Sequence, residues 1–493
     1  MLQSELIKLA DRIRSCKAEM QTVEVKSAHK GCPEKLRDTL SSFSNQDSGG
    51  TIVFGLDENN GFDPVGIYDA QDLQKHVTEQ CAQMVPPVRA VFTLAEYEDV
   101  LICAAEIPSV DLAERPCYYS GAGRIQGSYV RVGEADYHMT DYEIYCCEAF
   151  RRHVHDDERP VDRATVAVLD KNLIDEYIRN RQKDRPKSKQ LSTEQTYDML
   201  AITRDGHPTV AAMMNMGIYP QGFFPQWGIT AIVVPGKEIG DVAEDHARFI
   251  DNKRIEGTIY NMVEEAQQFC LRNMKVRTII DPATGKRTDR TEYPPDAVRE
   301  AILNALIHRD YSFYTEGTPV QINFFVDRLE IHSPGSLYGR MTVEQLGYAK
   351  MDLRNPALAV MAEAITGSEN RYSGIPTMRR ELAAYGLPAP VFENRRNEFV
   401  VTFYNSPTQA TGDPAQADAD GAKAETLLEF CKIPRSRQEI ADYLGVKTVY
   451  YAMRHYVQPL LDSRELTMTI PDHPSSRKQK YFAVILANKQ RDE

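Results

Sequence analysis

A stretch without any large apolar side chain, residues 405–421, divides this chain of 493 residues. The stretch consists of small and polar residues, so it cannot bury enough surface to offset the entropy of ordering. We therefore predict a linker there, with separately folded units on either side. A polar segment ending in proline, 153–160, marks a second boundary. The expected domains are 1–155, 156–404 and 422–493.

The composition is that of a folded protein without a membrane span. Hydrophobic residues make up 42% of the chain and charged residues 26%, which excludes global disorder. No apolar run approaches the roughly 18 residues that a bilayer requires, and no secretory signal pattern opens the chain. Nine scattered cysteines, without a Cys-x-x-Cys pair, are typical of free thiols in a reducing compartment. We therefore expect a cytoplasmic protein with no membrane partner.

A net charge of −13 argues against non-specific coating of nucleic acid by the whole surface, but it allows a local basic surface. Between residues 179 and 189, six basic side chains accompany one acid. Such a strip is typical either of a solvated helix end or of a phosphate-contacting surface. Its candidate nucleic-acid-binding residues are Arg179, Arg181 and Lys183.

The last segment has the pattern of a winged helix-turn-helix. Ser436 is a good N-cap for a first helix at 437–444, and Gly445 makes the turn into a second helix at 447–461. The two strands of the wing are expected at 466–470 and 481–485. From residue 432 to residue 480, nine basic and five acidic side chains give a local charge of +4. Lys447 and Arg454, early in the second helix, are candidates for DNA contact. The alternative is a protein-docking or dimerisation module.

The first segment alternates helical and strand patterns and carries acids at strand ends. Its expected helices begin at residues 2 and 33, and its expected strands are 23–25, 51–56, 90–94, 100–107 and 127–133. Glu19, Glu24 and Lys26 flank or lie on the first strand, and Asp57 ends the second. Because neighbouring strands lie about 5 Å apart, carboxylates at their ends can meet around one hard cation. Such a cation polarises a phosphodiester and activates water; the alternative is a solvated acidic face.

Four motifs of this segment resemble the schlafen core, or AlbA_2 domain, over nearly all of 1–150. They are Glu19-x-x-x-x-Glu24-x-Lys26, Leu40-Ser41-Ser42-Phe43-Ser44-Asn45, Ile52-Val53-Phe54-Gly55-Leu56-Asp57 and Tyr129-Val130-Arg131-Val132-Gly133. Schlafen nucleases are metal-dependent endoribonucleases with two Glu and one Asp at the cleavage site. The resemblance therefore implies catalytic and metal-binding roles for Glu19, Glu24 and Asp57 with Mn²⁺ or Mg²⁺. Lys26, on the same strand as Glu24, is a further catalytic candidate that could offset phosphate charge. Many bacterial members carry the domain as a nucleic-acid-binding module with no established cleavage.

A polar file runs along the predicted helix at 299–308. Glu300, Asn304 and His308 recur every four residues and so share one face of the helix. Such a file is either solvated or ligand-binding. An asparagine oxygen is a fitting ligand for hydrated Mg²⁺, and a glutamate one turn earlier can orient an attacking water.

The file resembles the N-box of the Bergerat ATPase fold. Residues 294–311, 327–337 and 354–356 resemble more closely the divergent ATP-binding domain that follows AlbA_2 in bacterial transcriptional regulators, some labelled RecG-like helicases. The likeness spans about 160–400 and implies ATP with Mg²⁺ on Asn304. It also implies that the nucleotide site is formed by Glu300, Asn304, His308, Ser333, Gly335 and Gly374.

Two departures weaken the expectation of hydrolysis. The adenine-reading Asp of the first glycine box is missing from the aligned stretch 332–335. Tyr372 stands where the second glycine box has Gly, the residue that lets the backbone approach phosphate. Neither a P-loop nor a helicase motor motif is present, so the helicase label has no support in the sequence.

Together these patterns predict an α+β multidomain protein. Its parts are a schlafen/AlbA_2 α+β core, a Bergerat-type α/β sandwich and a C-terminal winged helix-turn-helix. We expect an ATP-binding regulator of transcription that contacts DNA through the winged helix and RNA or DNA through the first domain. One alternative is a metal-dependent endoribonuclease gated by ATP, as in phage defence. The other is a scaffold that neither cleaves nor hydrolyses, and either form is compatible with a homo-oligomer.

Overall fold

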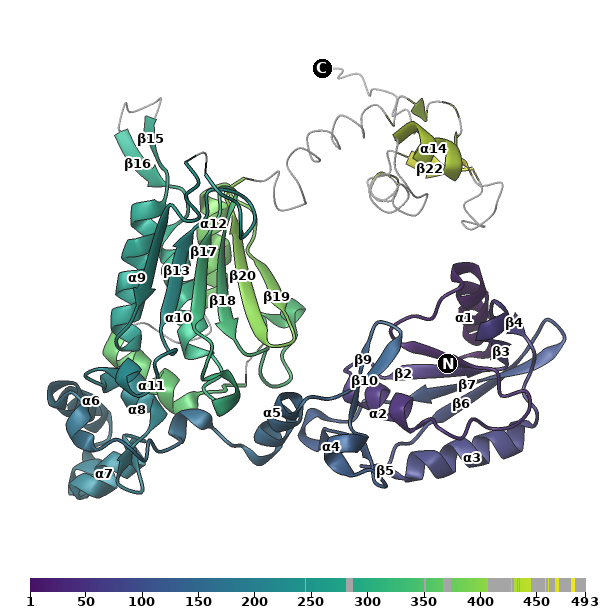
Figure 1. Ribbon diagram of the computed structural model, residues 1–493, viewed down its shortest axis with the longest axis horizontal. Helices are drawn as coiled ribbons and strands as arrows, with labels where there is room; N and C mark the ends of the chain where they lie inside the picture. The colour runs from purple at the N-terminus through teal and green to yellow at the C-terminus, as the bar shows by residue number, and fades with distance from the viewer. Residues whose placement is uncertain are drawn as a thin grey trace, which may run out of the picture.

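The computed structural model describes most of the first 406 residues and isolated parts of the remainder. The described residues are 1–243, 245–280, 287–349, 352–366, 374–406, 427, 430, 431, 433, 435–444, 457, 460, 466–469 and 480–483. Helices and several separate sheets alternate along the chain, so the protein is of the α+β multidomain class (Figure 1).

The first unit is a four-stranded sheet with helices on both faces. Its strand order is β1-β2-β7-β6, with β1 parallel to β2 and the other pairs antiparallel. Because side chains alternate along a strand, Val53 of β2 packs on the α1 side, whereas Ile52 and Phe54 pack on the α2 and α3 side. The bounds are β1 Val23–Lys26, β2 Gly50–Phe54, β6 Val91–Tyr97, β7 Val100–Ile107, α1 Gln3–Cys16, α2 Arg37–Asn45 and α3 Ala70–Ala82.

Two elements of this unit differ from expectation. The second helix begins at Arg37 and not at Pro33, because Gln80 of α3 binds the Leu36 N–H (3.0 Å) and the Pro33 carbonyl (2.8 Å) in a non-helical segment. The expected strand 51–56 is interrupted at Gly55, whose φ is +103°. Beyond it the chain turns into β3, which pairs with β4 and not with β1.

Short elements complete the first unit and lead to the second. A hairpin of β9 and β10 packs on α2, and α5 packs against 112–114 before the chain leaves. The bounds are β3 Leu56–Asp57, β4 Asp63–Pro64, β5 Met84–Val85, β8 Tyr118–Tyr119, α4 Gly123–Gly127, β9 Tyr129–Val132, β10 Ala135–His138 and α5 Asp141–Arg152.

The second unit is a six-stranded mixed sheet with helices on one face. The strand order is β14-β13-β17-β18-β20-β19, and only the β13–β17 pair is parallel among these described strands. Along β18, Leu329, Ile331 and Ser333 are buried on the helix side. The bounds of the strands are β13 Ile229–Val233, β14 Asp251–Ile255, β17 Val320–Phe324, β18 Arg328–Pro334, β19 Val391–Asn394 and β20 Glu398–Tyr404.

Helices α9, α10 and α12 pack together over this sheet, while α6, α7, α8 and α11 gather at one end of it (Figure 1). The bounds are α6 Lys171–Asp184, α7 Thr193–Met199, α8 Val210–Met216, α9 Ile259–Asn273, α10 Pro295–Ile307, α11 Pro356–Thr366 and α12 Gly374–Ala384. Two hairpins accompany them, β11 Thr203–Arg204 with β12 His207–Pro208 and β15 Val276–Ile280 with β16 Arg287–Thr291. None of the helices in the described ranges combines the length and hydropathy that crossing a bilayer requires.

The C-terminal segment is described only in part. A helix, α14, covers Arg437–Leu444 as the sequence predicts, and three short strands form a sheet in the order β21-β23-β22. Their bounds are β21 Arg435–Ser436, β22 Leu466–Met468 and β23 Lys480–Ala483. The predicted second helix, with Lys447 and Arg454, and nearly all of the predicted linker lie outside the described residues.

Candidate nucleotide site and acidic cluster

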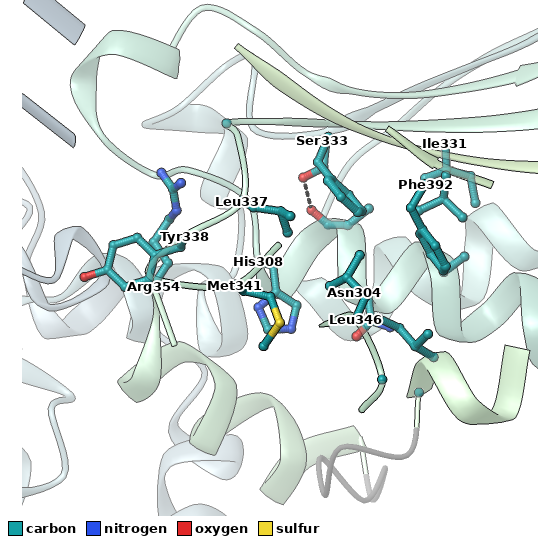
Figure 2. Close-up of a pocket in the computed structure, with 18 of the residues that line it drawn as sticks. Asn304, His308, Ile331, Ser333, Leu337, Tyr338, Met341, Leu346, Arg354 and Phe392 are labelled. Carbon is teal, nitrogen blue, oxygen red and sulfur yellow. Dashed lines mark hydrogen bonds between the residues drawn. The ribbon is translucent and has the colours of Figure 1, made fainter. Parts of the chain in front are cut away.

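One cavity between α10, the sheet and α12 collects every residue that the sequence assigns to nucleotide binding (Figure 2). Because they recur at helical spacing, the polar residues of α10 share the face that looks into the cavity. Ser333 and Gly335 enter from the end of β18, and Gly374 from the start of α12. The predicted residues that line this cavity together are Glu300, Asn304, His308, Ser333, Gly335 and Gly374.

The remaining walls of the cavity are largely apolar. Ile331 and Phe392 project from the sheet, and Leu337, Met341 and Leu346 come from the segment that follows β18 (Figure 2). A concave, mostly apolar site with a few convergent polar groups is the usual form of a small-molecule or cofactor site.

Glu300 and Asn304 form the polar centre of the cavity. The Asn304 Nδ2 group donates to Glu300 Oε1 at 3.2 Å, which leaves the amide oxygen of Asn304 free to face a ligand. Burial raises the pKa of the Glu300 carboxyl. The backbone of Gly374 lies so close that a Cβ there would fall 2.1 Å from Glu300 Oε1 and 2.9 Å from Asn304 Nδ2.

The other predicted residues have distinguishable roles. Burial and the cationic Arg354 lower the pKa of His308 to about 4, so this imidazole is neutral at pH 7. The Ser333 hydroxyl donates to the Ala305 carbonyl at 2.7 Å and thereby ties β18 to α10. Gly335 has φ +100°, and a Cβ there would lie 2.6 Å from the Cβ of Asp310. Ser333 and Gly335 therefore shape the cavity wall.

The sequence did not assign a role to Arg354, which also lines the cavity. Its Nη1 atom pairs with Asp310 Oδ2 at 2.5 Å, and its Nη2 atom donates to the Ser336 carbonyl at 2.8 Å. The neighbouring Asn355 donates to the backbone carbonyls of Ile307 (2.8 Å) and Arg309 (2.7 Å), at the end of α10. The motif Arg354-Asn355-Pro356 was visible in the sequence, but its partners are distant along the chain.

These residues fit a nucleotide with Mg²⁺. The site offers the Asn304 amide oxygen, a donor that Mg²⁺ takes when it is also bound to phosphates, and a carboxylate one helical turn away. The close glycine backbone at Gly374 suits a phosphate chain, and the apolar walls suit a base. Among the described residues that line the cavity, Arg354 is the one strong base.

A second cluster of charged side chains lies in the first unit. Arg131 of β9 is only 1% exposed and is surrounded by carboxylates. Its guanidinium lies 3.1 Å from Glu19 Oε2, 2.7 Å from Glu24 Oε2 and 3.2 Å from Asp136 Oδ1. Lys26 adds a further ion pair to Glu24. Two of the predicted catalytic acids, Glu19 and Glu24, therefore lie close together with Lys26 nearby. Both are paired with the arginine.

The predicted grouping of Asp57 with these acids needs correction. Asp57 accepts from the Asn59 N–H at 3.2 Å and caps the following turn, and its strand β3 pairs with β4 although it still lies near β1. No group of three His, Cys, Asp or Glu side chains in the described part of the chain is arranged to hold a metal ion. The residues present do not fit the expected Mn²⁺ or Mg²⁺ centre, because Glu19 and Glu24 are paired with Arg131.

The predicted basic strip lies on α6 and the turn after it. Arg179 is exposed and donates to the Asp175 carbonyl of its own helix at 3.1 Å. Lys183 is also exposed and donates to Asn180 Oδ1 at 3.2 Å, and Arg181 lies 5.6 Å from the ring of Tyr177. These contacts are local, so the charges stay available to a partner.

Comparisons with known proteins show that three parts of the chain are similar to known families. Residues 19–140 match the family "Schlafen, AlbA_2", and residues 317–403 match HATPase_c_4, described as "Putative ATP-dependent DNA helicase recG C-terminal". Residues 423–482 match "Filamentation induced by cAMP protein Fic-like, C-terminal domain". The HATPase_c_4 match includes Gly335, Arg354 and Gly374, but it begins after α10.

Two solved structures are similar to the chain. The DIP2311 protein from Corynebacterium diphtheriae is 18% identical, with 94% of this chain and 93% of that chain covered and a TM-score of 0.39. The N-terminal domain of a RecG-related protein from Nitrosomonas europaea is 24% identical, with 27% and 93% covered and a TM-score of 0.23. A search of curated proteins found no match. From the family matches, the chain carries a schlafen AlbA_2 domain followed by a RecG-type domain of the HATPase_c_4 family.

Proposed function

We propose that the protein is a nucleotide-dependent regulator that acts at nucleic acid, and that its cavity binds ATP with Mg²⁺. The observation that carries this proposal is the meeting of Glu300, Asn304 and the Gly374 backbone at one end of an apolar cavity. The Asn304 amide oxygen beside a close glycine backbone forms a site for a magnesium-bound phosphate chain, and the Glu300 carboxylate lies one helical turn away where water can reach it. The match to HATPase_c_4 supports the same ligand.

The roles within the site follow from chemistry and position. The Asn304 amide oxygen holds the hydrated cation, and bound Mg²⁺ offsets the charge of the phosphates. Glu300 lies one helical turn away, and its raised pKa brings it closer to the range of a general base that can accept a proton from water. The nucleoside would lie at the other end of the cavity, beside neutral His308 and the apolar walls.

Asn304→Ala should abolish magnesium-dependent binding, because it removes the amide oxygen that faces the cation. Glu300→Ala should spare binding and remove hydrolysis, since it deletes only the base. Calorimetric titration of the full chain with a non-hydrolysable ATP analogue and Mg²⁺ measures the first effect, and phosphate release from ATP the second. Absence of binding to the wild type at millimolar ligand would overturn the proposal.

The nucleic-acid part of the proposal rests on the schlafen AlbA_2 domain and on local charge. The first unit would contact RNA or DNA, the C-terminal segment would contact DNA through Lys447 and Arg454, and the strip on α6 would add phosphate contacts. Each basic group that neutralises a phosphate releases counterions, so such binding weakens as salt rises.

Replacing Arg179, Arg181 and Lys183 together with Glu should weaken binding to all sequences alike and flatten the dependence of affinity on salt. The slope of log K against log salt should fall by about 0.9 for each lost duplex phosphate contact. Fluorescence anisotropy with labelled duplex DNA and single-stranded RNA measures this. Lys447→Glu with Arg454→Glu forms the comparison pair, and it should affect duplex DNA more than RNA. If the dependence of affinity on salt is unchanged in both sets of variants, these basic side chains are solvated and do not contact phosphate.

A further inference from the structure

Helix α5 connects the two larger units and is bonded to both (Figure 1). On the side of the first unit, Glu148 pairs with Arg124 of α4. On the side of the second unit, Glu143 accepts two bonds from Arg396, at 2.8 and 2.9 Å. Helix α5 is therefore an element through which a change at the second unit can reach the first.

Helix α5 and the chain that follows it rest directly on the outside of the cavity wall. Phe150 packs edge-on against Tyr338, with ring centroids 5.5 Å apart. His155 places its Nδ1 atom 3.1 Å from the carbonyl oxygen of Arg354. Tyr338 and Arg354 both line the cavity and lie together at one end of it (Figure 2).

One carboxylate oxygen is shared between the cavity and α5. Asp310 Oδ2 accepts from the Tyr142 hydroxyl at 2.6 Å and also pairs with Arg354 Nη1 at 2.5 Å. The other oxygen, Oδ1, is held by the Ser312 N–H at 2.8 Å. Two donors share one buried oxygen, and the Tyr142 hydroxyl also interacts with the Arg354 guanidinium. A weaker hold by Arg354 on Asp310 therefore leaves that oxygen more fully to Tyr142.

Arg354 has a donor to spare for a ligand. Its side chain is 10% exposed, and its buried Nε atom has no hydrogen-bond partner. The Nε atom is itself enclosed, so an acceptor that enters the cavity would meet the exposed part of the guanidinium, whose five N–H donors exceed the two bonds it makes to Asp310 and Ser336. Since Gly374 and Asn304 suit the phosphates, the atom that reaches Arg354 belongs to the nucleoside.

We propose that Arg354 is a positioning residue that couples the cavity to α5 through Asp310. This inference rests on the proposed nucleotide function. When an acceptor atom of the bound nucleoside binds the Arg354 guanidinium, the pairing of Arg354 with Asp310 Oδ2 weakens. The hydrogen bond from Tyr142 to the same oxygen then becomes stronger. The bound ligand therefore strengthens the contact of α5 with the second unit. Since coupling between two sites is reciprocal, a stronger contact of α5 also strengthens ligand binding.

Tyr142→Phe tests this coupling, because it deletes only the hydroxyl that binds Asp310. The matched control is Tyr145→Phe in the same helix, whose hydroxyl binds Asp156 at 2.7 and 2.8 Å. With the full chain, Mg²⁺ and a non-hydrolysable ATP analogue, Tyr142→Phe should raise the Kd roughly fivefold or more. Tyr145→Phe should leave the Kd unchanged. Hydrogen exchange over 141–152 should slow on ligand addition in the wild type and in Tyr145→Phe, but not in Tyr142→Phe.

The outcomes separate this inference from the function on which it rests. If the wild type binds nucleotide and both variants bind it equally well, the coupling is refuted and the nucleotide site stands. If both variants lose stability and affinity in parallel, the hydroxyl of Tyr142 is merely structural, and the coupling is again refuted. If the wild type binds no nucleotide, the proposed function fails and the coupling fails with it.

Discussion

Replacing Arg131 with leucine should destabilise the first unit by about 3–5 kcal/mol, the usual cost of removing one partner from a buried ion pair. The variant leaves Glu19, Glu24 and Asp136 close together without the guanidinium that now lies among them. Hydrogen exchange of β1 and β2 in the full chain reports the stability of this unit separately from the second. Arg131→Lys should lose less, because it keeps the charge.

The deficit of Arg131→Leu should depend on pH. Burial and the neighbouring Glu24 raise the pKa of Glu19 from 4.5 to about 7. A carboxyl whose folded pKa is raised binds its proton more tightly in the folded state, so stability is full below 4.5 and falls as pH rises toward 7. Without the guanidinium this trend should steepen, so the deficit should be smaller at pH 5 than at pH 8. Arg89→Leu, at an exposed position, should change stability by no more than about 0.5 kcal/mol. Equal effects of both variants would contradict a buried charge cluster.

The polar side of the cavity was predictable because its residues follow a local rule. Glu300, Asn304 and His308 share a face at helical spacing whatever the rest of the chain does. The glycines were added by resemblance to a known family, since nothing in the spacing of Gly335 or Gly374 places them at α10. The apolar walls come from strands and loops whose approach depends on the whole sheet, and no local pattern marks them.

The acidic cluster shows where such reasoning fails. The predicted grouping of the acids assumed that the strand before Asp57 continues straight beside β1. Gly55 interrupts that strand. The guanidinium that gathers the acids is far away along the chain, since Arg131 is 112 residues from Glu19. Arg354 was missed for the same reason, because its partner Asp310 is not a neighbour in any local period. Long-range ion pairs leave no periodic trace in one sequence.

Gly374→Ala should reduce magnesium-dependent nucleotide affinity at least about tenfold and any hydrolysis by roughly 10²-fold, because a small misplacement of reacting groups is this costly. The added methyl carbon would meet Glu300 Oε1 at 2.1 Å and Asn304 Nδ2 at 2.9 Å, so both side chains must move from the positions in which they face a ligand. Alanine in the first turn of α12 does not weaken the helix, since alanine has a higher helix propensity than glycine. The melting temperature should therefore stay unchanged or rise while binding falls. Gly317→Ala is the matched control, because a Cβ at that position meets no atom within 4 Å. Calorimetric titration of both variants measures the Kd. If Gly374→Ala has the wild-type Kd, the phosphate chain does not lie against this glycine.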